Sequence, residues 1–134
     1  MEVILVDRAP SAREYLDLRE AVGWHGFSAE VVSPALVCSL FAVCAEHDGK
    51  AVGCGRVVGD GGVYFYVQDI LVHPDFQRRG LGGVIMARVR DYLDAAAGPG
   101  SFIGLMSAPG LERFYARYGF VPFPADSPGM MIWK

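Results

Sequence analysis

The chain has 134 residues, of which 52% are hydrophobic and 20% charged, a balance that predicts one folded domain over residues 1–134 and excludes a disordered chain. Its net charge of −3 disfavours nucleic acid as a partner, because phosphate backbones are bound by a broad basic face. No apolar run reaches the roughly 18 residues of a membrane span, and residues 1–5 carry no basic leader. We expect a cytoplasmic protein with no membrane partner.

The predicted elements follow from apolar residues at helical or alternating spacing, bounded by Gly and Pro. In chain order they are a strand at 2–6, helices at 12–22 and 33–40, strands at 41–46, 51–58 and 63–72, a helix at 80–97, a strand at 102–106, a helix at 111–118, and strands at 120–123 and 130–133. This order predicts an α/β fold, with a mixed sheet of about six to seven strands and helices on both faces.

Three cysteines, Cys38, Cys44 and Cys54, lie in apolar stretches and lack the spacing of metal ligands. Apolar surroundings favour buried structural thiols. We therefore expect no metal site at these positions.

The segment 67–86 joins an apolar strand to a helix through a glycine-rich turn, Gln77-Arg78-Arg79-Gly80-Leu81-Gly82-Gly83. Residues without side chains let backbone N–H groups face a ligand, and a helix N-terminus adds about half a positive charge. Arg78 and Arg79 strengthen the attraction for phosphate. The segment predicts a site for a phosphorylated ligand.

Two common phosphate-binding loops do not fit this turn. A P-loop requires Lys-Ser or Lys-Thr, and the sequence has neither pair. A dinucleotide fingerprint, G-x-G-x-x-G, requires a third glycine, which is missing after Gly83, as is an acidic residue about 20 positions further on.

The turn instead belongs to a larger pattern. It reads Asp69-Ile70-Leu71-Val72-His73-Pro74, then Gln77-x-x-Gly80-x-Gly82, and about 35 residues later Phe114-Tyr115-Ala116-Arg117-Tyr118-Gly119-Phe120. This combination resembles the GNAT superfamily of acyl-CoA N-acyltransferases, and the resemblance covers most of the chain. It implies a three-layer fold with a V-shaped splay between central strands, and acetyl-CoA as the acyl donor without a metal. The cofactor-binding residues that it implies are Ile70, Leu71, Val72, Gln77, Arg78, Arg79, Gly80, Leu81, Gly82 and Gly83.

For catalysis, the resemblance implies that Tyr115 protonates the departing thiolate; a phenol has a reference pKa of about 10. The alternative is that Tyr115 only packs on the sheet. Many relatives carry a Glu on the central strand, where this chain has Gln68-Asp69. Strand alternation predicts opposite faces for these two residues. Asp69 is either the general base or a buried, hydrogen-bonded carboxylate; a water chain or His25 are the other candidates.

The acceptor pocket is expected to draw on Trp24, His25, Phe27, Arg56, Tyr64 and Tyr66. Aromatic walls suit an aromatic or amphipathic amine. As alternatives, Trp24 and Phe27 cover the core, and Arg56 pairs with Asp60 or binds a substrate carboxylate.

The implied reaction transfers an acetyl group from acetyl-CoA to a primary amine of a small molecule, within a ternary complex. Protein or peptide N-acetylation and a catalytically silent acyl-CoA-binding module are the alternatives. The apolar stretch Gly129-Met130-Met131-Ile132-Trp133 leaves room for a homodimer.

Overall fold

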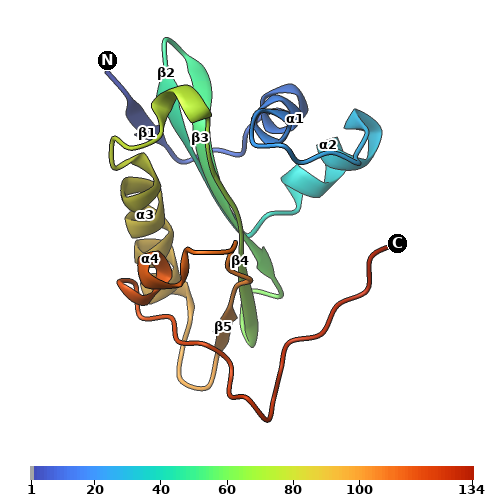
Figure 1. The fold of residues 1–134 in the computed structure, drawn as a ribbon, viewed down its shortest axis with the longest axis vertical. Helices are drawn as coiled ribbons and strands as arrows, with labels where there is room; N and C mark the ends of the chain where they lie inside the picture. Colours follow the sequence, from blue (N-terminus) through green and yellow to red (C-terminus); the bar gives the residue numbers. More distant parts are fainter. Residues whose placement is uncertain (1) are drawn as a thin grey trace.

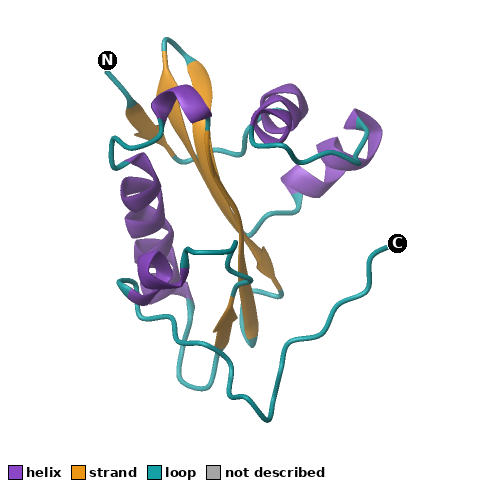
Figure 2. Cartoon of the chain, viewed as in Figure 1, coloured by secondary structure: helices purple, strands orange, loops and turns teal. Residues whose placement is uncertain are grey.

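A computed structural model describes residues 2–134 and contains one five-stranded sheet in the order β1-β2-β3-β4-β5, with helices on both faces (Figure 1). The expected mixed α/β fold is confirmed. The elements, coloured by type in Figure 2, are β1 (Ile4–Val6), α1 (Ala12–Ala21), α2 (Ala29–Val37), β2 (Phe41–His47), β3 (Lys50–Gly59), β4 (Tyr64–Val72), the 3-10 turn η1 (Pro74–Phe76), α3 (Leu81–Ala96), β5 (Phe102–Gly104) and α4 (Glu112–Ala116).

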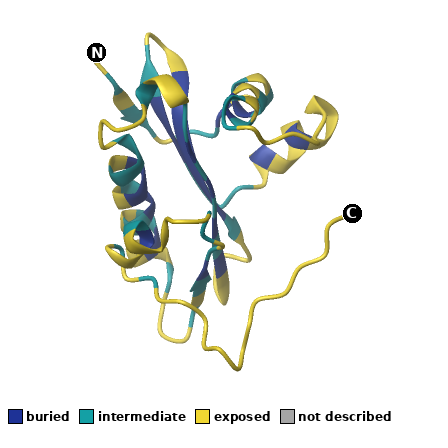
Figure 3. Ribbon diagram, in the orientation of Figure 1, coloured by how far each residue is buried: buried dark blue, intermediate teal, exposed yellow. Residues whose placement is uncertain are grey.

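The main core lies between the sheet and α3. Ile85, Met86, Val89 and Leu93 share one face of this helix at spacings of three and four residues, and all are buried against the sheet (Figure 3). The opposite face is covered by α1 and α2, which bury smaller apolar clusters. Within residues 2–134 no helix is both long and apolar enough to cross a bilayer.

The hairpin between β2 and β3 closes as its sequence predicts. His47 faces Lys50, and the two residues between them, Asp48 and Gly49, have φ angles of 51° and 75°. Asp-Gly is a preferred pair for such a two-residue turn because both positions need a positive φ.

A β-bulge interrupts β4 at Asp69, whose φ angle is 57°. Gln68 faces Arg56 and Leu71 faces Cys54, so the pairing with β3 shifts by one residue between them. Before the bulge Val67 packs on the α3 side; after it Leu71 packs on the α1 side. The alternation of side chains is therefore reset, and Gln68 and Asp69 share the α1 face. The expectation of opposite faces is wrong because the sequence does not reveal the bulge.

The parallel strands β4 and β5 pair at three positions only: Tyr64 with Phe102, Phe65 with Ile103, and Tyr66 with Gly104. After Gly104 the chain that follows β5 turns away from β4, whereas β4 itself continues to Val72. The backbone of 67–72 consequently has no strand beside it on the β5 side. This divergence is the expected splay.

The two strands predicted after α4 do not form, so the sheet has five strands instead of six to seven. From residue 120 onward the chain is irregular and mostly exposed. Its prolines, Pro122, Pro124 and Pro128, cannot donate backbone hydrogen bonds, and no strand of the sheet pairs with this part of the chain.

Two further expectations are wrong around α2. The helix begins at Ala29, not at Ser33, and Pro34 lies inside it, because buried Val32 and Leu36 extend its apolar face. Cys38 is exposed because it follows the last turn of this helix, whereas Cys44 and Cys54 are buried in β2 and β3 as expected.

Candidate active site

A cavity of about 170 Å³ lies in the splay, between β4, the chain that follows β5, and α4. Several predicted site residues line it together: Trp24, Asp69, Ile70, Leu71, Val72, Gln77 and Tyr115. The splay leaves the β5 side of β4 unpaired, so a ligand in the cavity meets an unpaired backbone edge. Leu105, Met106 and Leu111 form the facing wall.

The glycine-rich turn is anchored at both ends. The Gln77 side chain donates from Nε2 to the carbonyl of Val72, 2.9 Å away, and thereby ties the turn to the end of β4. Arg78 and Gly80 have φ angles of 63° and 79°, which redirect the chain into α3. Gly80 caps the helix without a side-chain hydrogen bond. The first-turn amides of α3 thus have no helical acceptor and can serve an anion.

The glycines of this turn meet different requirements. Gly80 needs a positive φ. The Gly83 carbonyl accepts a hydrogen bond of 3.0 Å from the Tyr118 hydroxyl, and a Cβ at Gly83 would lie 3.2 Å from that oxygen. At Gly82 a Cβ would meet only ordinary contacts, at 3.7 Å from Phe114. Packing within the fold therefore does not require glycine at position 82. A ligand that approaches the backbone closely at this position would require it.

Arg78 and Arg79 are exposed beside this turn, and neither forms an ion pair within residues 2–134. The Arg79 guanidinium lies 5.5 Å from the ring centre of Phe76. Both positive charges are available to an anionic ligand.

Tyr115 brings a phenol into the cavity from α4. Its side chain packs edge-on against Phe114 and Phe120, with ring centres 5.0 and 6.2 Å away, and only 9% of the residue is exposed. This burial raises the pKa of Tyr115 above its ordinary value. The phenol therefore stays protonated at neutral pH and can act as a proton donor.

The Asp69 carboxylate is held by three side chains. It accepts hydrogen bonds from the Tyr15 hydroxyl at 2.7 Å and from Arg56 Nε at 3.0 Å, and Arg19 Nη1 lies 3.5 Å away. Only 1% of the Asp69 side chain is exposed. Burial, together with the hydrogen bond to Asp69, raises the pKa of Tyr15 to about 12. This environment favours a buried carboxylate that links α1 to β3 and β4.

Arg56 is engaged in the same network. Besides Asp69 it reaches Ser39, whose Oγ accepts a hydrogen bond of 2.8 Å from Nη1. It does not pair with Asp60, which instead accepts from the amides of the β3–β4 turn; these hydrogen bonds lower the pKa of Asp60.

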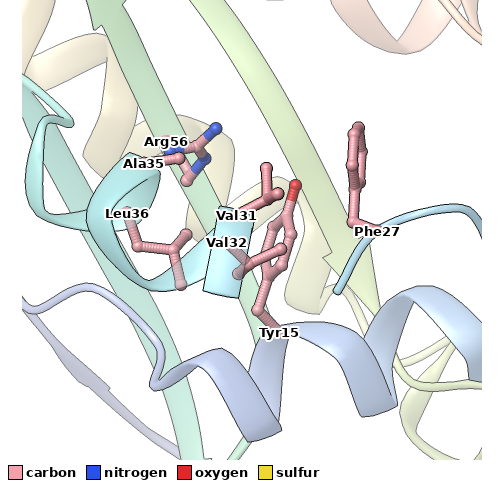
Figure 4. Close-up of a pocket in the computed structure, with 7 residues that line it drawn as sticks. All are labelled: Tyr15, Phe27, Val31, Val32, Ala35, Leu36 and Arg56. Carbon is pink, nitrogen blue, oxygen red and sulfur yellow. The ribbon is translucent and has the colours of Figure 1, made fainter. Parts of the chain in front are cut away.

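A second cavity, of about 100 Å³, opens between α1, α2 and β3 (Figure 4). Phe27, Tyr15 and Arg56 line it together with apolar residues of α2. The expected acceptor wall is thus divided, because Trp24 lines the cavity in the splay and Phe27 lines this one. Neither lining includes His25, Tyr64 or Tyr66.

Comparison with known proteins identifies the family. A model of the acetyltransferase (GNAT) domain matches residues 39–122. The chain belongs to the GNAT acetyltransferase family. The protein of Pyropia yezoensis named "Uncharacterized N-acetyltransferase ycf52" is 31% identical to this chain over 121 residues. The match covers 87% of this chain and 68% of that protein.

Two other relatives of this GNAT chain are informative. The rice protein named serotonin N-acetyltransferase 2, chloroplastic, is 33% identical over 86 residues, which are 64% of this chain and 42% of that protein. The crystal structure of SA2161 from meticillin-resistant Staphylococcus aureus, described as a protein of unknown function and probable acetyltransferase, has a TM-score of 0.92 at 28% identity. The match covers 99% of this chain and 100% of SA2161.

Sequence reasoning missed Arg19 of this GNAT domain. Its guanidinium lies between three aromatic rings, 5.5 Å from Tyr15, 5.4 Å from Trp24 and 5.0 Å from Phe27. It therefore joins the loop after α1 to the Asp69 network. The available signal was its position four residues after Tyr15, on the same helix face and shortly before an aromatic loop.

Proposed function

We propose that this chain transfers an acetyl group from acetyl-CoA to the primary amine of a small molecule, with Tyr115 as general acid. The observation that carries the proposal is the cavity in the splay, where the buried Tyr115 phenol faces the unpaired edge of β4. That edge leads, through the turn anchored by Gln77, to the free amides at the start of α3.

The donor occupies this continuous path. Backbone groups of Ile70, Leu71 and Val72 pair with the amides of the pantetheine arm, as an added strand would. The amides from Arg78 to Gly83 and the charges of Arg78 and Arg79 hold the pyrophosphate. The absence of a side chain at Gly82 is explained by the close approach of this ligand.

The reaction balances with the residues of the cavity. The nitrogen of a neutral amine attacks the thioester carbonyl carbon, a C–N bond forms and the C–S bond breaks. The departing thiolate takes the Tyr115 proton, and the nitrogen releases a proton that restores the phenol through solvent. We place Asp69 in a positioning role because both arginines and Tyr15 engage its carboxylate. A water path is the remaining route for the amine proton.

The acceptor end of the cavity favours an aromatic or amphipathic amine. Trp24 and the apolar wall of Leu105, Met106 and Leu111 offer contact area with few polar groups. The name of the rice relative, serotonin N-acetyltransferase, points to the same chemical class.

The test measures thiol release from acetyl-CoA with arylalkylamines, polyamines, amino acids, aminoglycosides and amine-bearing peptides. We expect the highest kcat/KM with arylalkylamines. In Tyr115→Phe, kcat should fall about 10²–10⁴-fold with the affinity for coenzyme A unchanged. Tyr92→Phe is the matched control, because Tyr92 stacks on Phe41 in the core and lies outside both cavities.

Three outcomes would contradict parts of the proposal. Saturable coenzyme binding without turnover on any amine would indicate a silent binding module. Turnover confined to peptides would overturn the small-molecule acceptor. An unchanged kcat in Tyr115→Phe at all pH values would remove Tyr115 from proton transfer.

A further inference from the structure

The short helix α4, which carries Tyr115, is tied to α3 through Tyr118. Only five residues form α4, and turns or irregular chain lie on both sides of it. Within residues 2–134, two hydrogen bonds join the segment 112–120 to a distant element, and Tyr118 makes both. Its hydroxyl donates to the Gly83 carbonyl at 3.0 Å, and its own carbonyl accepts from Arg90 Nη1. Both partners belong to α3, so the place of α4 depends on Tyr118 (Figure 1).

The hydroxyl of Tyr118 contacts the turn that we assign to the coenzyme phosphates. Gly83 lies in the first helical turn of α3. A Cβ at Gly83 would lie 3.2 Å from the Tyr118 oxygen, and a Cβ at Gly82 would lie 3.7 Å from the Phe114 ring. The two residues without side chains therefore let aromatic rings from α4 and the turn after it lie directly against the start of α3.

A continuous line of contacts leads from this turn to the phenol of Tyr115. The ring of Phe114 lies 5.5 Å from that of Tyr118 and 5.0 Å, edge-on, from that of Tyr115. Closely packed side chains transmit a displacement because there is little free space to absorb it. Movement of the first turn of α3 therefore reaches the phenol through Tyr118 and Phe114.

The position of the phenol matters more for the rate than for binding. A misplacement of about 1 Å in a reacting group can cost roughly 10²-fold in rate. Tyr115 lines the cavity in the splay, whereas Tyr118 does not. Tyr118 therefore has no direct access to the thioester, and any effect that it has on proton transfer acts through Tyr115.

We propose that Tyr118 is a positioning residue, which couples phosphate binding at the turn 77–83 to the placement of the Tyr115 phenol. The inference rests on the proposed function, in which this turn holds the pyrophosphate and Tyr115 is the general acid. When the first-turn amides of α3 bind phosphate, the hydrogen bond from Tyr118 to Gly83 holds α4 against the ordered turn. The phenol is then fixed in the cavity when the donor is bound.

The first test is a double-mutant cycle between Tyr118 and Tyr115. Tyr118→Phe keeps the ring and removes only the hydroxyl. We expect kcat to fall at least about tenfold, while the Kd for coenzyme A changes less than about threefold. In a Tyr115→Phe background the same substitution should change kcat less than about twofold, because the phenol through which it acts is gone. A variant that merely loosened the fold would lower kcat in both backgrounds.

Tyr92→Phe is the matched control for this cycle. It removes a hydroxyl from a tyrosine of α3 whose ring stacks on Phe41, outside both cavities. We expect kcat to be unaltered by this substitution in both backgrounds. Circular dichroism checks that each variant is folded.

Hydrogen exchange provides a second test, on the unaltered chain. The probe is adenosine 3′-phosphate 5′-diphosphate, the nucleotide half of coenzyme A, which lacks the pantetheine arm that would reach the cavity. It should slow exchange at 77–83 and also at 115–120, although it does not contact the latter segment. In Tyr118→Phe it should slow exchange at 77–83 alone.

The outcomes separate this inference from the proposed function. The coupling alone is overturned if the nucleotide protects 77–83 but not 115–120 in the unaltered chain. It is also overturned if Tyr118→Phe lowers kcat equally in both backgrounds, or leaves kcat unchanged while Tyr115→Phe lowers it. A nucleotide that protects neither segment would contradict the donor path, and an unchanged kcat in Tyr115→Phe would contradict the general acid; either result removes the coupling as well.

Discussion

Asp69 combines two roles that the sequence alone does not connect. Its left-handed backbone lies at the bulge in β4, and its carboxylate forms ion pairs with both Arg56 and Arg19. A positive φ costs about 1–3 kcal/mol in a non-glycine residue and persists only where the surroundings hold it. Here the hydrogen bonds from Tyr15 and Arg56 to the Asp69 carboxylate stabilise this backbone conformation.

Asp69→Asn should destabilise the fold, because it leaves two arginines without their buried counter-charge. We expect the free energy of unfolding to fall by about 3–5 kcal/mol, measured by urea denaturation. Asp94→Asn also removes an Asp–Arg pair, with Arg90, but that pair is exposed on α3. Its cost should stay below about 1 kcal/mol.

The same variant separates a structural carboxylate from a base. If Asp69 only positions its neighbours, the folded fraction of Asp69→Asn should keep the shape of the pH–rate profile. The base role would instead belong to Asp69 if the pH–rate profile of Asp69→Asn lost its acid limb while its free energy of unfolding stayed close to that of Asp94→Asn.

At the scale of the element, Glu14 fixes the start of α1. Its carboxylate completes a capping box with Ser11, accepts two hydrogen bonds from Arg8 and one of 2.8 Å from the Ala51 amide. The hydrogen bond from Arg8 is the largest of the causes that lower the pKa of Glu14 to about 2. One side chain therefore joins α1 to β3.

This lowered pKa predicts an acid-dependent stability. The folded chain binds the Glu14 proton more weakly than the unfolded chain, so the contribution is complete above about pH 4.5 and is lost as the pH falls towards 2. After solvent screening it should amount to about 1–2 kcal/mol. Measured by urea denaturation, the free energy of unfolding of Glu14→Gln should be lower than that of the unaltered chain by this amount at pH 7. Near pH 2 the two free energies should be equal. The exposed Glu30→Gln is the control, in the first turn of α2; an equal loss there would contradict the assignment.

At the start of α3, we expect one substitution to affect the free energy of unfolding and the affinity for coenzyme A in opposite directions. Gly82→Ala places a methyl group at ordinary contact distance in a helix, so the free energy of unfolding should stay equal or rise by up to about 1 kcal/mol. In the complex that we propose, the same methyl group stands where the coenzyme phosphates approach the backbone. The Kd for coenzyme A, measured by calorimetry, should rise at least about tenfold, that is by 1.4 kcal/mol.

Gly98→Ala provides the comparison for this substitution, because Gly98 follows α3, has no positive φ and leaves open space for a Cβ. Coenzyme affinity should not change there. Unaltered affinity in Gly82→Ala would mean that the pyrophosphate does not contact this turn.

At the scale of the molecule, the features that the sequence predicts are those with local causes. The periodicity of Ile85, Met86, Val89 and Leu93 predicts α3, and Asp48-Gly49 predicts its hairpin turn. The glycine-rich turn at 77–83 is likewise contiguous, so its residues could be named together as a candidate anion site. Such features need no knowledge of distant parts of the chain.

The features that escape the sequence depend on distant contacts. The bulge at Asp69 rests on side chains from α1 and β3, and Arg19 meets Asp69 only after α1 packs on the sheet. The segment 130–133 has the continuous apolar composition of a short strand, yet within the described residues no strand of the sheet pairs with it. A local sequence pattern indicates which element a segment can form. It does not indicate whether the fold places a partner strand or side chain beside that segment.

Coenzyme A should stabilise the molecule by bridging the two arms of the splay, since on the path that we propose it contacts β4, the turn at 77–83 and α4. At a concentration 100 times its Kd, the gain is about 2.7 kcal/mol, which raises Tm by roughly 10 °C. Hydrogen exchange should slow at 67–72 and 77–83 and stay unchanged in β1, which lies at the far edge of the sheet. Pantetheine, which lacks the phosphates, should protect 67–72 alone. Protection by pantetheine at 77–83, or by coenzyme A in β1, would contradict the assigned path.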